Sequence, residues 1–104
     1  MGKIVICAQG EATVGLLAGL RKATNHPMGS LRNALTAGSV LLERRVFGND
    51  HDEAALDILG VVDCLEHHGV HYQLYELAAS QDFDDVPRDR CRIALGVLKN
   101  ALAR

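Results

Sequence analysis

The stretch LRKATNHPMGSLRNALT, residues 20–36, decides the fold that this chain predicts. His26 precedes Pro27, and a residue before proline is disfavoured in the helical region, so a helix over about residues 13–24 ends here. Pro27 suits the first turn of a following helix, and Gly38 suits the position just after its end. The stretch therefore predicts two consecutive helices with a tight break between them.

Apolar segments on either side of this helical pair predict strands. Residues 3–8 are apolar on both faces, which is typical of a central strand that is covered on both sides. Residues 40–47 carry Glu43, Arg44 and Arg45 in the middle, and charge in that position suits an edge strand, where it discourages aggregation.

The clearest helical signal begins at Asp50. Together with Glu53, three positions later, Asp50 forms a capping box, and Gly69 ends the helix. The apolar stripe of this helix comprises Ala55, Ile58, Leu59, Val62 and Leu65. A strand over residues 70–77 follows.

The order strand, helix, helix, strand, helix, strand predicts the α/β class. We expect a two-layer α+β domain, residues 1–104, with a three-stranded, mainly antiparallel sheet and three helices on one face. Residues 1–78 form its core and residues 79–85 a polar, acidic linker.

Residues 86–104 predict a last, amphipathic helix that runs to about residue 103. Its apolar stripe comprises Cys91, Leu95, Leu98 and Leu102. We expect this helix to cover the second face of the sheet, in its own chain or exchanged with a neighbouring copy, because an open apolar face invites association. That face comprises Val5, Cys7, Tyr75 and Leu77, with Leu41 and Phe47.

Composition excludes several classes of function. A net charge of −2 gives no general attraction to nucleic acid or to an anionic membrane, and no apolar run approaches the ~20 residues of a membrane span. The N-terminus lacks the features of a signal peptide, so we expect a cytoplasmic protein. Its three cysteines are odd in number and lack CxxC spacing, which predicts reduced thiols.

Two groups of residues suggest chemistry, and both have simpler explanations. Cys64, His67, His68 and His71 suggest zinc, but the break at Gly69 separates the last histidine from the helix, and structural zinc takes four well-placed ligands. The acidic residues of 50–53 are explained by helix capping and by the helix dipole. With no nucleophile and no glycine-rich phosphate loop, we expect no catalytic residue, no metal and no cofactor.

The run Leu20-Arg21-Lys22-Ala23-Thr24, with the element order around it, resembles the C-terminal domain of the bacterial ribosomal stalk protein. The resemblance covers about residues 3–77. It implies a non-enzymatic protein-interaction module whose partner-binding face uses the first two helices. The positions that match this face are Val14, Leu17, Arg21 and Arg32. The implied partner is another protein, with a homodimer or larger homo-oligomer also open.

The same element order is similar to that of the Clp protease adaptor. That family binds the α-amine of an N-terminal residue with an Asn-Asp motif after the first strand, and the matching positions here are Gln9-Gly10-Glu11-Ala12-Thr13. This resemblance implies a peptide-binding adaptor as the alternative function. A small metal-dependent or Cys/His enzyme is a third, less favoured alternative.

Overall fold

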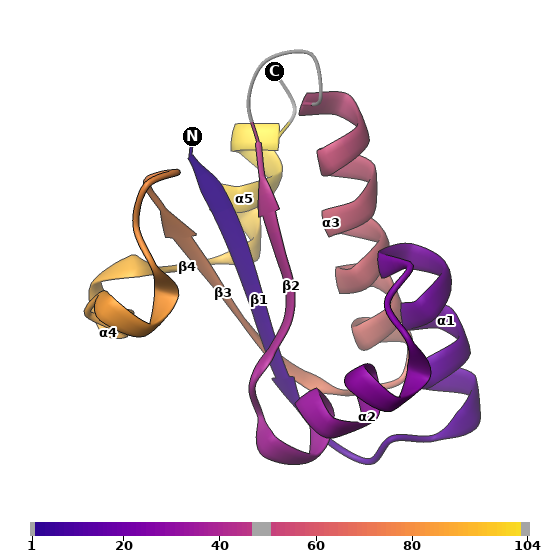
Figure 1. The fold of residues 1–104 in the computed structure, drawn as a ribbon. Helices are drawn as coiled ribbons and strands as arrows, with labels where there is room; N and C mark the ends of the chain where they lie inside the picture. Colours follow the sequence, from indigo (N-terminus) through magenta and orange to yellow (C-terminus); the bar gives the residue numbers. More distant parts are fainter. Residues whose placement is uncertain (1, 47–50, 103–104) are drawn as a thin grey trace.

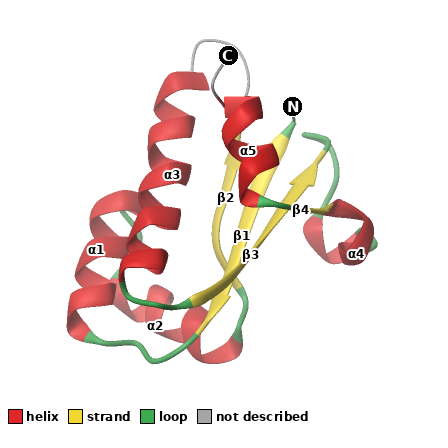
Figure 2. Cartoon of the chain, turned by 180° about the vertical axis from the view of Figure 1, so that it is seen from behind, coloured by secondary structure: helices red, strands yellow, loops and turns green. Residues whose placement is uncertain are grey.

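The computed structural model describes residues 2–46 and 51–102, shown in Figures 1 and 2. The elements are β1 (Lys3–Gln9), α1 (Val14–Thr24), α2 (Met28–Ala37), β2 (Val40–Arg45), α3 (His51–His67), β3 (His71–Leu77), a 3₁₀ turn (Phe83–Asp85), α4 (Arg88–Cys91), β4 (Arg92–Ile93) and α5 (Leu95–Leu102). Within the described residues, four strands form an antiparallel sheet in the order β2-β1-β3-β4. The α/β class is confirmed, with one strand more than expected.

The central position predicted for the first strand is confirmed. β1 lies between β2 and β3, and Ile4, Val5 and Ile6 are fully buried because both faces of the sheet are covered. β2 lies at the edge, as its mid-strand charges predict. There Glu43 pairs with the buried Lys3 of β1, with Nζ and Oε1 2.6 Å apart.

The break between α1 and α2 forms as the sequence predicts. Thr13 caps α1, since its Oγ1 accepts a hydrogen bond from the N–H of Leu16 (3.3 Å). Asn25 ends α1 in the left-handed conformation, with φ 60°, and Pro27 occupies the N-cap position of α2 in an extended conformation, without a side-chain capping hydrogen bond. The expected contributions of Phe47 and Asp50 lie outside the described residues.

One face of the sheet is covered by α1, α2 and α3 (Figure 1). The helices α1 and α3 approach closely because glycines face the contact. A Cβ built on Gly19 would lie 2.6 Å from Cys64 Sγ, and one on Gly15 would lie 3.4 Å from the His68 ring. The Cys64 thiol also donates to the carbonyl of Leu16 across this contact (3.8 Å). Small residues therefore set the spacing of the helical layer.

The expectation of a single helix over residues 86–103 is wrong. The segment contains α4, then the two-residue strand β4, then α5. β4 pairs with Leu74 and Tyr75 of β3. This pairing satisfies backbone groups at the open edge of β3, which a continuous helix would leave without partners. Tertiary pairing thus overrides the helical spacing of the apolar residues.

The apolar stripe expected on that helix divides between the two faces of the sheet. Leu98 and Leu102 are buried among the residues of the helical face, and Leu95 packs against them. Accordingly, α5 lies beside α3 (Figure 2). Cys91 alone packs on the second face. The expectation that this stripe covers the second face is therefore wrong for Leu95, Leu98 and Leu102, and only Cys91 lies there.

The second face is covered instead by the chain between β3 and β4. Phe83, inside the segment expected to be a linker, is buried against Val5, Cys7, Tyr75 and Leu77. Its ring meets the ring of Tyr75 edge-on, with centroids 4.9 Å apart. The guanidinium of Arg88 lies 4.5 Å from the centroid of the Phe83 ring. The chain therefore covers this face without a second copy.

Candidate functional site

The four residues matched to the partner-binding face do not all reach the surface. Val14, at the start of α1, is 77% exposed, and Arg21 and Arg32 are also exposed. Leu17 is 1% exposed and lies in the core, because it shares the sheet-facing stripe of α1 with Leu16 and Leu20. A side chain in the core has almost no surface to offer a partner, so the exposed positions of this set are Val14, Arg21 and Arg32.

A hollow of about 380 Å³ lies where α1 turns back into α2. It is lined by Ala18, Arg21, Lys22, Asn25 and Met28. The left-handed turn at Asn25 brings Met28 beside the end of α1, where its side chain packs partly against the core. Val14 and Ala18 lie along the helical row that leads to this hollow, and Arg32 lies one turn beyond Met28. We name this surface the α1–α2 face; it comprises Val14, Ala18, Arg21, Lys22, Asn25, Met28 and Arg32.

The α1–α2 face is basic, in contrast to the rest of the chain. Residues 12–42 carry Arg21, Lys22 and Arg32 and no Asp or Glu. The other residues carry all thirteen acidic side chains and eight of the eleven Lys and Arg residues, so the net charge of −2 divides into +3 and −5. Among the described residues, none of these three cations makes an ion pair. The sequence analysis does not include Lys22 and Met28 in the partner-binding face, although the absence of Asp and Glu from residues 12–42 can be read directly from the sequence.

A second hollow, of about 410 Å³, opens where β1 leads into α1. Leu16 and Val70 supply its apolar lining. Gln9, Glu11 and Thr13, which the resemblance to the Clp adaptor singled out, also line it, together with Gly10, His68, Gly69 and His71. Its polar groups therefore include one carboxylate and two imidazoles.

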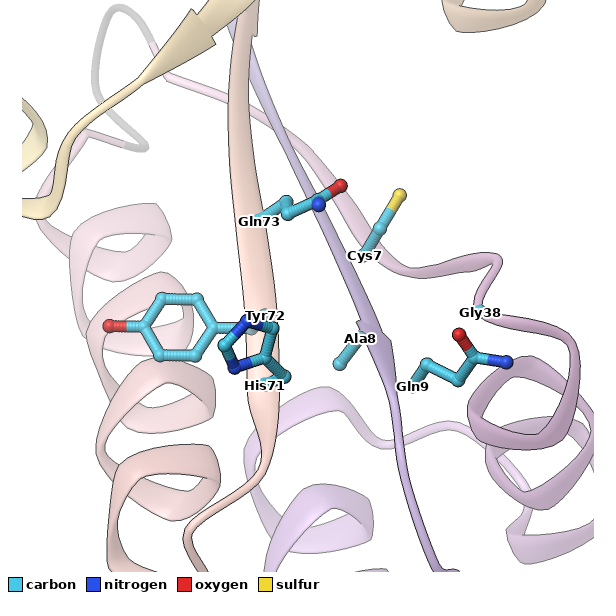
Figure 3. A pocket seen from close by; sticks show the side chains of 7 residues that line it. All are labelled: Cys7, Ala8, Gln9, Gly38, His71, Tyr72 and Gln73. Atoms are coloured by element: carbon cyan, nitrogen blue, oxygen red, sulfur yellow. The ribbon is translucent and has the colours of Figure 1, made fainter.

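A smaller cavity of about 170 Å³ lies over the neighbouring ends of β1 and β3 (Figure 3). Cys7 and Gln73 are partners in the ladder and project to one side of the sheet, while Tyr72 projects to the other. Burial raises the pKa of the Cys7 thiol, although nearby Arg88 opposes this shift. Burial also raises the pKa of Cys64. Both groups are therefore protonated at neutral pH and lack the lowered pKa of an activated nucleophile.

The four residues considered for zinc do not form one group. Cys64 faces α1, His67 and His68 lie against each other with ring centroids 5.2 Å apart, and His71 lies on β3. In the described part of the chain, no three His, Cys, Asp or Glu side chains form a group that could hold a metal ion. Within residues 2–46 and 51–102, no helix has the length and apolar character needed to cross a bilayer.

Comparisons of the chain with protein-family models, with curated proteins and with solved structures find no match. The function proposed for this chain therefore rests on the geometry and charge of the α1–α2 face and of the hollow where β1 leads into α1.

Proposed function

We propose that this protein is a non-enzymatic interaction module that binds an acidic segment of another protein on its α1–α2 face. The observation that carries the proposal is an open hollow whose lining includes two cations and no carboxylate, within a segment, residues 12–42, that contains no Asp or Glu. A partner with an apolar anchor and flanking carboxylates matches both properties. The resemblance to the stalk domain supports the same face.

The physical roles of the residues differ. An apolar side chain of the partner gains by leaving water against Ala18 and Met28, and such buried anchors supply most of the affinity at small interfaces. Arg21, Lys22 and Arg32 lie around this point and attract carboxylates, which speeds association and selects the partner by charge. Val14, which is largely exposed, adds apolar area at one end. An amphipathic helix with apolar residues at i and i+4 has the shape to use this surface.

A synthetic peptide tests the proposal directly. The probe is a fluorescent amphipathic helix with leucine anchors and glutamate flanks, and a second peptide carries lysine in place of glutamate. We expect binding of the first only, measured by fluorescence anisotropy, and weaker binding as salt increases. Arg21→Glu should weaken binding by at least about tenfold.

The matched control is Arg90→Glu, which makes the same charge change at an exposed side chain of α4. If both variants weaken binding equally, the effect is one of net charge and the proposed face is wrong. Equal binding of the lysine peptide would show that the basic residues do not select the partner.

A second candidate function, binding of a peptide's N-terminal residue, is favoured by the hollow beside β1. The Glu11 carboxylate can accept hydrogen bonds from an α-ammonium group, while Leu16 and Val70 provide an apolar lining for the adjoining side chain. Peptides that begin with leucine, with a free or an acetylated amine, test this function. The free amine should bind more tightly, and Glu11→Gln should remove the difference.

A further inference from the structure

The solvent-facing side of α3 carries the properties that the α1–α2 face requires of a partner. Leu56, a large apolar side chain, is 74% exposed at the centre of this side. Asp52 and Glu53 lie one turn before it and Asp63 two turns after it, all exposed and near the same side of the helix. This set, Asp52, Glu53, Leu56 and Asp63, is here named the α3 knob.

Two neighbours leave the α3 knob open. Gly60 lies one turn after Leu56 and has no side chain to cover it. Asp57 is directed elsewhere, since its carboxylate pairs with Arg44 of β2 (3.5 Å). The leucine is thus flanked by carboxylates that are available to an incoming cation.

We propose that a second copy of this chain is the partner bound on the α1–α2 face. Leu56 of one copy fills the hollow beside Met28 of the next. The carboxylates of Asp52, Glu53 and Asp63 then face the cations of Arg21, Lys22 and Arg32. The inference rests on the proposed function, because it names the partner of that same face.

Charge complementarity within one chain is the argument for a second copy. The α1–α2 face lies in the acid-free segment 12–42, whereas the described residues of α3 include five acidic side chains and no Lys or Arg. Scattered exposed leucines are ordinary, so Leu56 alone would mean little. The match of an apolar knob with a hollow, and of three carboxylates with three cations, is what selects this occupant.

The contact is heterologous, because different surfaces of the two copies meet. Each association leaves one α3 knob and one α1–α2 face unused, so copies add head to tail until a ring closes or a chain grows. Both surfaces belong to the helical layer, and the covered second face of the sheet takes no part (Figure 1). A contact built on one hollow is small, so we expect a reversible, concentration-dependent equilibrium that salt weakens.

Sedimentation velocity over a range of protein concentrations tests the association. The average mass of the wild-type chain should rise with concentration at low salt and fall when salt is added. Leu56→Lys should stay monomeric, and it changes an exposed position, so the melting temperature should change little. The matched control, Val97→Lys, alters an exposed apolar residue of α5 and should associate as the wild type does.

A mixing experiment tests the head-to-tail geometry. Arg21→Glu disables the α1–α2 face but keeps the α3 knob, and Leu56→Lys disables the knob but keeps the face. Each variant alone should be monomeric, whereas an equal mixture should form a 1:1 heterodimer that grows no further. A mixture that remains monomeric, or a Leu56→Lys variant that associates normally, would overturn the inference.

The acidic probe peptide separates the two proposals. If the chain associates, the peptide should dissociate the oligomer by competing for the α1–α2 face. If the chain is monomeric at every concentration but still binds the peptide, the self-association is wrong and the proposed function stands. If it neither associates nor binds the peptide, both proposals fail.

Discussion

The two faces of the sheet are buried by different means. On the helical face, α1, α2, α3 and α5 contribute to a cluster of twenty buried residues among those described. On the second face, the described part of the cluster has five, and its cover comes from the irregular chain between β3 and β4, with Phe83 as the largest contributor. Long amphipathic helices spread burial over many side chains. The short cover of the second face concentrates its burial in the ring of Phe83. Single substitutions should therefore have different effects on stability on the two faces.

The largest effect is expected from Leu98→Asp on the helical face. Leu98 is fully buried, so the new carboxylate loses its hydration without gaining a partner, and we expect a loss of roughly 4 kcal/mol or more. Urea denaturation measures it. Val97→Asp, at the exposed neighbour, should change stability by less than about 0.5 kcal/mol. Similar losses from both variants would show that α5 is not fixed on the helical face.

A smaller but still large effect is expected from Phe83→Ala on the second face. Truncating a buried phenylalanine costs about 3 kcal/mol, and the contacts with Tyr75 and Arg88 are lost with it. Hydrogen exchange should then show early opening of residues 78–93 while α3 stays protected. Simultaneous opening of both regions would contradict the separation of the two faces. Phe83→Leu should restore part of the loss.

Gly19→Ala probes the close contact between α1 and α3. The added Cβ would lie 2.6 Å from Cys64 Sγ, so either the Cys64 side chain must leave its rotamer or the helices must separate, and we expect a loss of about 2 kcal/mol. Cys64→Ala should relieve much of this loss in the double variant, measured by a mutant cycle. The control is Gly29→Ala, where no heavy atom lies within 4 Å, and there the better helix propensity should stabilise by up to about 1 kcal/mol.

The smallest effect concerns the buried thiol of Cys7. Burial raises the pKa of Cys7 above its ordinary value of 9.0, so the unfolded chain releases this proton at lower pH than the folded protein does. The stabilisation is fully present below the ordinary value and is lost as pH rises through the raised one. We expect denaturation curves to show declining stability above about pH 9, and a shallower decline for Cys7→Ala. An unchanged decline would show that Cys7 does not contribute to it.

The regular part of the fold could be predicted because local and tertiary preferences agree there. The His26-Pro27 step ends one helix and permits the next, and the two apolar faces of β1 require neighbours on both sides. The C-terminal segment could not be predicted in the same way. The spacing of Cys91, Leu95 and Leu98 fits one helix, but the open edge of β3 recruits Arg92 and Ile93 as a strand instead.

The candidate site shows the same division. The resemblance to the stalk domain implies that Arg21 and Arg32 lie on a binding face, and both side chains are exposed. It could not exclude Leu17, because the orientation of α1 on the sheet decides which of its adjacent leucines face inward. The hollow itself depends on the turn at Asn25, which brings Met28 back beside Ala18. The sequence alone does not show that Met28 and Ala18, which lie on different helices, come together in this way.

The position of β1 also has a kinetic consequence. The first strand of the chain pairs with β3, where Lys3 lies opposite Leu77, so its central place depends on closing a loop of most of the chain. Non-local pairings of this kind slow folding. Until they form, Ile4, Val5 and Ile6 belong to an exposed apolar strand with a strong tendency to pair between chains. We therefore expect refolding yield to fall with protein concentration, and a substitution that weakens β3 to increase aggregation during refolding more than it lowers the stability of the folded state.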